Sequence, residues 1–133
     1  MSKLILVYFF ILCFGCNSSP AQKGPGKADT LLIGTWKGSS ICQLKNSPCH
    51  DETNVYHISK NKADDTFYVD AGKIVDGVEE SMGVLPFIYN DKTNQFTSTA
   101  HGIWTFNVEG DKLEGTLLVN GDLYRKIMLK KTY

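Results

Sequence analysis

From residue 31 to the C-terminus, apolar and polar residues alternate in short runs that are separated by turn-forming residues. Two-residue alternation is typical of β-strands with one buried face, and no crossover helix is indicated between the runs. The pattern predicts about eight strands. They cover residues 34–42, 54–60, 66–75, 84–89, 95–100, 101–108, 112–119 and 122–131.

The connections between these strands are predicted to be short. Asn120-Gly121 is the strongest hairpin dipeptide of the chain, and Gly110 marks another tight turn. Residues 76–83 resemble a turn-rich link instead. We therefore predict an all-β domain, an antiparallel up-and-down meander that closes into a barrel and so removes its exposed edges.

One residue interrupts the predicted core. In the last strand, alternation places Arg125 on the same face as Ile127 and Leu129. A buried guanidinium needs an ionic partner or an aromatic platform, so we expect Arg125 to have one.

The first residues follow a different pattern. Lys3 precedes an unbroken apolar run over residues 4–14, which has the length of a signal-peptide core and is too short to span a bilayer comfortably. Gly15-Cys16 then resembles the lipobox of bacterial lipoproteins, in which the signal peptidase cuts before a Cys that carries lipid. The resemblance implies a signal peptide over residues 1–15 and a lipidated, palmitate-bearing Cys16.

Two alternatives remain for this segment. Cys13 and Phe14 depart from the usual lipobox, and cleavage near residues 19–21 would give a soluble secreted or periplasmic protein. A retained N-terminal membrane helix is the other alternative. The Gly- and Pro-containing residues 16–30 are predicted to be a flexible linker before a folded domain at 31–133. Because no acidic run follows Cys16, we favour the periplasmic side of the outer membrane.

The chain has four Cys residues. If Cys13 leaves with the signal peptide and Cys16 carries lipid, then Cys42 and Cys49 remain as a pair in an oxidising compartment, and we predict a disulfide. No C-x-x-C motif indicates redox chemistry. Zinc is the alternative, although the spacing matches no compact zinc motif. Its ligands would come from Cys42, Cys49, His50, Asp51, Glu52 and His57.

Gly34-Thr35-Trp36, at the head of the first predicted strand, resembles the G-x-W signature of lipocalins and fatty-acid-binding proteins. In that superfamily the Trp closes one end of the barrel, and an Arg or Lys of the last strand packs across it. The resemblance implies a lipocalin-like barrel in which Trp36 and Arg125 form this structural plug. The Cys42–Cys49 pair is not a feature of the superfamily.

Charge and motifs exclude several functions. Fourteen basic and fourteen acidic residues give a net charge of +0, so nothing indicates a nucleic-acid partner. No G-x-S-x-G, H-E-x-x-H, phosphate loop or dinucleotide motif is present, and the three His residues are well separated. We predict a non-catalytic, monomeric protein without metal or cofactor.

Two functions remain open. The barrel could bind a small hydrophobic ligand, with walls from seven residues. Alternatively, these side chains fill the barrel, and the protein binds an envelope protein through its loops, foremost residues 42–49 and then 76–82. The predicted wall residues are Tyr56, Ile58, Phe67, Val69, Phe96, Trp104 and Phe106.

Overall fold

The computed structural model of the protein describes residues 26–133. Eight antiparallel strands close into a barrel in which each strand pairs with its neighbours in sequence and β1 pairs with β8. The predicted all-β barrel is confirmed. The elements are α1 (Lys27–Leu32), β1 (Gly34–Cys42), β2 (Glu52–Lys60), β3 (Phe67–Val75), β4 (Val78–Asn90), β5 (Gln95–Ser98), β6 (Ile103–Glu109), β7 (Lys112–Val119) and β8 (Asp122–Thr132).

The link predicted over residues 76–83 is wrong. Only Asp76 and Gly77 form a turn, with φ of 50° and 78°, and β4 begins at Val78. Two successive residues with positive φ match the twist of a hairpin, which is why Asp-Gly is favoured there. A register shift between Ala71 and Gly72 interrupts the regular pairing of this long hairpin, and a β-bulge of this kind bends a strand.

The boundary predicted between two later strands also differs. β5 ends at Ser98 and β6 begins at Ile103, so that His101 belongs to neither strand. His101 has φ of 58°, and Gly102 has φ of 145°. A Cβ on Gly102 would lie 2.7 Å from the carbonyl oxygen of Leu118, so only glycine fits this crossing.

Part of the predicted linker is folded. α1 covers residues 27–30 of that segment and packs its apolar side chains, Ala28, Leu31 and Leu32, against the barrel core. These positions follow the i, i+3, i+4 spacing of an amphipathic helix. Cys16 and the signal peptide lie outside the described residues. Over residues 26–133, no helix has the length and apolar character needed to cross a membrane.

Aromatic side chains fill the half of the barrel that α1 covers. Phe87 and Phe96 stack with ring centroids 4.6 Å apart, and Phe67 meets Phe96 edge-on at 5.7 Å. Gly115 lies opposite Phe106, and a Cβ there would come within 2.6 Å of the Phe106 ring. Because Gly115 has no side chain, the strand leaves room for the Phe106 ring inside the barrel.

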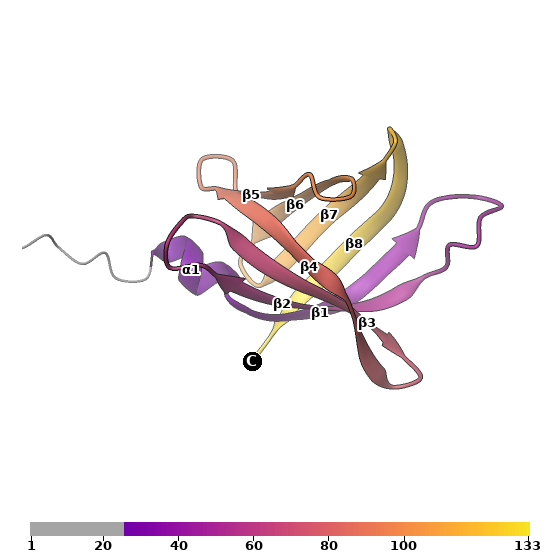
Figure 1. The fold of residues 1–133 in the computed structure, drawn as a ribbon, viewed down its shortest axis with the longest axis horizontal. Helices are drawn as coiled ribbons and strands as arrows, with labels where there is room; N and C mark the ends of the chain where they lie inside the picture. Colours follow the sequence, from indigo (N-terminus) through magenta and orange to yellow (C-terminus); the bar gives the residue numbers. More distant parts are fainter. Residues whose placement is uncertain (1–25) are drawn as a thin grey trace, which may run out of the picture.

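The two ends of the barrel differ. Figure 1 shows α1 at one end and the connection between β1 and β2 extending at the other. The antiparallel register puts the first residues of β1, β3, β5 and β7 at the α1 end and their last residues at the opposite end. We call the opposite end the mouth.

Candidate functional site: the mouth of the barrel

A cavity of about 310 Å³ opens at the mouth. Apolar side chains and a few polar groups face one another across it, which is the usual composition of a small-molecule site. The polar lining residues come mainly from β2 and β8. The lining residues are Glu52, Asn54, Tyr56, Ala71, Met82, Gly83, Leu85, His101, Trp104, Leu117, Tyr124, Arg125 and Ile127.

Strand alternation explains the polar side of the cavity. Glu52, Asn54 and Tyr56 occupy every second position of β2 and therefore share its inner face. Val55 between them lies on the outer face of the wall. β1 pairs with β2 on one side and with β8 on the other, and Arg125 of β8 points inward and is 8% exposed. Alternation thus brings a carboxylate, an amide, a phenol and a guanidinium to one side of the cavity.

The polar groups bind one another. Arg125 Nη2 lies 3.4 Å from Glu52 Oε1, and Arg125 Nη1 donates to the carbonyl oxygen and hydroxyl of Ser40 at 3.3 and 3.1 Å. Asn54 Nδ2 donates to the other oxygen of Glu52 at 3.3 Å. The sequence-based expectation that a buried Arg125 needs a partner is met by Glu52 and Ser40.

Tyr56 stays a neutral phenol at every ordinary pH. Burial raises the pKa of Tyr56 strongly, and the nearby Arg125 lowers it by a smaller amount. Its ring meets Phe106 edge-on at a centroid distance of 6.1 Å, which fixes the ring between the filled half and the cavity. The hydroxyl can therefore donate or accept a hydrogen bond at the floor of the cavity.

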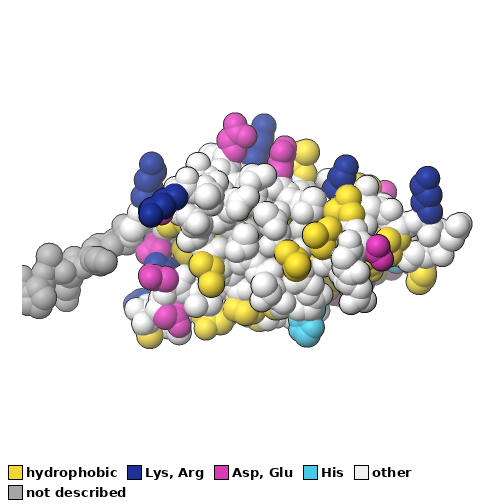
Figure 2. All heavy atoms as spheres, turned by 90° about the horizontal axis from the view of Figure 1, so that it is seen from above, with side chains coloured by type: hydrophobic (Ala, Val, Ile, Leu, Met, Phe, Trp, Pro, Cys, Tyr) yellow, Lys and Arg dark blue, Asp and Glu magenta, His cyan; other side chains and the backbone are white. Residues whose placement is uncertain are grey.

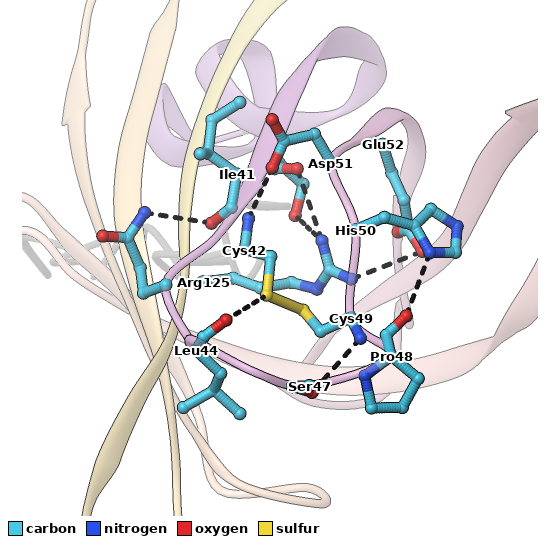
Figure 3. The surroundings of a disulfide bond; sticks show 12 residues. Ile41, Cys42, Leu44, Ser47, Pro48, Cys49, His50, Asp51, Glu52 and Arg125 are labelled. Atoms are coloured by element: carbon cyan, nitrogen blue, oxygen red, sulfur yellow. Dashed lines mark hydrogen bonds and ion pairs between the residues drawn. A yellow bond between two sulfur atoms is a disulfide. The ribbon is translucent and has the colours of Figure 1, made fainter.

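The Cys42–Cys49 disulfide forms as predicted and lies at the rim of the mouth. Its loop continues β1, because Gln43 N donates to the carbonyl oxygen of Tyr124, and Asp51 accepts a hydrogen bond from Cys42 N. Figure 3 shows Arg125 alongside the disulfide, with its guanidinium turned towards Glu52. The clip therefore fixes the chain that carries Glu52 into the cavity.

Of the seven predicted wall residues, Tyr56 and Trp104 line the cavity. Trp104 is held by a hydrogen bond from its Nε1 to the carbonyl oxygen of Ala100 at 2.8 Å. The other five do not line it; they pack into the filled half and are at most 3% exposed, as in the alternative in which these side chains fill the barrel. These are Ile58, Phe67, Val69, Phe96 and Phe106.

The predicted plug is wrong in one partner. Trp36 is fully buried at the closed end, and the cation above its ring is Lys131 Nζ, 5.7 Å from the ring centroid. In the β1–β8 register Trp36 lies opposite Lys131, whereas Arg125 lies opposite Cys42, at the mouth. Lys131 also donates to the carbonyl oxygens of Thr30 and Leu31, and so binds the N-terminal segment.

The histidines do not converge on the cavity as a group. His57 lies on the outer face, where Nε2 meets Glu79 at 2.5 Å and Nδ1 meets the Thr35 hydroxyl at 3.1 Å. His50 is exposed beside the disulfide loop, and His101 is at the rim. The disulfide also consumes the two thiols that the zinc alternative requires. Within residues 26–133, no cluster of three or more metal-ligating side chains occurs.

A wider groove lies at the α1 end of the barrel. Charged residues of the turns line much of it, including Lys62, Asp64 and Asp91. Charged residues form a larger share of its lining than of the lining of the mouth cavity, so the mouth is the better candidate for a ligand site.

These features define the protein as a small, closed, eight-stranded antiparallel β-barrel with a cavity at one end. No known protein-family profile matches the chain, and no curated protein is significantly similar to it in sequence. Its structure is similar to secretory abundant heat soluble protein 4 from Ramazzottius varieornatus. The two share 18% identity over 84% of this chain and 100% of that chain, with a TM-score of 0.38.

Proposed function

We propose that the protein is a non-catalytic binding barrel that holds one compact molecule in its mouth. The observation that carries this proposal is the cavity of about 310 Å³, which is lined by apolar side chains and by the polar groups of Tyr56 and Arg125. Such a combination excludes water from an apolar body and orients a polar end. The inward polar groups would bind and orient the ligand without taking part in a chemical step.

The filled half of the barrel limits the size of the ligand. Phe96 and Phe106 are at most 1% exposed, and they block the interior below Tyr56. The cavity lies at the lower end of the volumes of small-molecule sites, which begin at roughly 300 Å³. A compact ring system therefore fits better than a long alkyl chain.

Filling the cavity tests the proposal. Ala71 is 3% exposed and lines the cavity, so Ala71→Leu places three further carbon atoms in it. Native mass spectrometry of protein isolated from its own cells should show an additional small-molecule mass in the wild type and lose it in Ala71→Leu. Val84→Leu, on the exposed outer face of β4, is the control that keeps the mass. Equal ligand loading of Ala71→Leu and the wild type would contradict the proposal.

We further propose that Cys16 anchors this barrel to the cell envelope on its periplasmic side. The support is the sequence pattern of residues 4–16, and the oxidised Cys42–Cys49 pair agrees with an exported domain. The mature protein should begin at Cys16 and carry diacylglycerol and palmitate, measured by intact mass, and Cys16→Ala should abolish the lipid. A lipid-free chain that begins near residue 20 would instead show ordinary secretion.

Protein binding is the second candidate function, because the β3–β4 hairpin exposes apolar side chains beside the mouth. Val78 is 64% and Met82 49% exposed, with two Glu residues between them. Figure 2 shows apolar side chains exposed among uncharged surface on the face that it draws. A photo-crosslinker at residue 78 should capture one defined envelope protein, whereas the same group at Glu114, on β7, should not. Identical products at both positions would contradict this function.

A further inference from the structure

We propose that Glu52 makes the mouth cavity select uncharged polar ligands over anions. This inference rests on the proposed binding function, and it names the ligand class and the residue that determines it. Arg125 alone would turn the cavity into a site for carboxylates, because a guanidinium is matched to them in geometry and charge. Glu52 cancels that charge from inside the cavity.

The geometry of the ion pair supports this role. Glu52 Oε1 lies 3.4 Å from Arg125 Nη2, and the side chains of Arg125 and Glu52 are only 10% and 14% exposed. Water therefore screens this pair little. The other residues that line the cavity include His101 at the rim and no further carboxylate or basic side chain. The floor of the cavity thus carries a dipole and no net charge.

Both members of the pair are held in place. Asn54 binds the second oxygen of Glu52, and Ser40 accepts two hydrogen bonds from Arg125. Asp51, the residue before Glu52, accepts a hydrogen bond from Cys42 N and so holds the strand entrance against the disulfide. An anion that approaches Arg125 therefore meets a carboxylate that cannot easily swing away, and like charges at such a short distance repel strongly.

An uncharged ligand can use both partners. A primary amide or lactam offers an oxygen to Arg125 or to the Tyr56 hydroxyl and an N–H to Glu52, so its donor and acceptor match the dipole of the floor. Trp104 and Leu117 provide the apolar wall for a ring attached to such a group. The predicted class is a compact, uncharged ring compound that carries an amide-like group.

A matched pair of probes tests the inference. 2-Naphthamide and 2-naphthoate have the same shape and differ in charge at pH 7. In NMR titrations that follow the chemical shifts of the protein's backbone amides, the wild type should bind 2-naphthamide at least tenfold more tightly than 2-naphthoate. Glu52→Gln keeps the shape of the side chain and removes its charge, and it should raise the affinity for 2-naphthoate at least tenfold. Glu114→Gln, on the exposed outer face of β7, is the control and should leave both affinities unchanged.

The outcomes separate this inference from the function on which it rests. If both probes bind the wild type in the mouth with equal affinity, the barrel is a binding protein but Glu52 does not select against anions, and the inference is overturned. If neither probe shifts the amides of the mouth, the proposed binding of compact ring compounds fails as well. The comparison of the two probes on the wild type decides the question even if Glu52→Gln does not fold.

Discussion

At the scale of single residues, Trp36 and Lys131 close the end of the barrel opposite the mouth. Trp36 Nε1 donates to the carbonyl oxygen of Leu32 at 2.9 Å, while Lys131 covers the indole and donates to the carbonyl oxygens of Thr30 and Leu31 at 3.0 and 3.1 Å. These carbonyls belong to the last turn of α1, where helices leave their acceptors without partners. The pair thus donates hydrogen bonds to the free carbonyl oxygens of the helix end and also covers the core at this end of the barrel.

Replacing these two side chains should lower the free energy of unfolding by different amounts. Trp36→Ala leaves a cavity in a fully buried site and should cost about 3–5 kcal/mol. Lys131→Met keeps the apolar stem over the indole and removes only the charged donor, so it should cost about 1–2 kcal/mol. Urea unfolding measures both values. Lys130→Met, at the neighbouring exposed position, should change little, and a Lys131→Met protein as stable as the Lys130→Met protein would contradict this role.

The sequence could predict the face on which each of these residues lies, but not its height along the barrel. Arg125 and Lys131 are six residues apart on β8, so alternation assigns both to the same face, and either could have packed across Trp36. Only the pairing of β1 with β8 places Lys131 opposite Trp36. This register depends on contacts between the two ends of the chain, which no local pattern reports.

At the scale of elements, α1 is bound to the barrel wall through an ion pair as well as through its apolar face. Lys60 Nζ, at the end of β2, lies 2.8 Å from Asp29 Oδ1, and the same carboxylate accepts a hydrogen bond from Gly26 N through its other oxygen. The hydrogen bond from Lys60 lowers the pKa of Asp29 below its ordinary value of 3.8. Asp29 therefore connects the start of α1 with the end of β2.

The lowered pKa predicts a pH dependence. Because Asp29 binds its proton less readily in the folded than in the unfolded state, its contribution to stability is complete above pH 3.8 and is lost as the pH falls through the folded pKa. Asp29→Asn should therefore be less stable than the wild type at pH 7, and the difference should shrink below pH 3.8. Thermal unfolding of both proteins across this range measures it. A difference that does not change with pH would show that the ion pair is not its source.

The elements that the sequence identified well are those with strong alternation and an unambiguous turn. β7 and β8 match their predicted ranges closely, because Asn120-Gly121 sets their hairpin. The first half of β4 was missed because Glu79, Glu80 and Ser81 lie on a hairpin arm that extends beyond the barrel and is exposed on both faces. A strand with no buried face leaves no apolar period in the sequence.

At the scale of the whole molecule, the barrel combines a filled half and a hollow half. The sequence left open whether the aromatic residues line a cavity or fill the barrel, and at the α1 end they fill it. Nearer the mouth, several inward positions carry small or polar residues, among them Ser40, Ala71 and Ser98. The sequence therefore predicted the composition of the interior, while the separation into two halves depends on the register of all eight strands.

This division predicts a gradient of local stability along the barrel axis. Exchange of an amide proton requires local opening, and opening the closed end disrupts the contacts of Trp36, Phe87 and Phe96, whereas opening the mouth disrupts few apolar contacts. In hydrogen exchange at constant pH, amides of the strands around these aromatic rings should exchange most slowly. Amides of the β3–β4 hairpin around Glu79 should exchange fastest among the strands.

A bound probe in the cavity should slow exchange at Ala71 and its neighbours at the mouth and leave the closed end unchanged, because the core there is already packed. Uniform protection from one end to the other would mean that the empty half is as stable as the filled half, and the architecture would then not determine where the barrel opens.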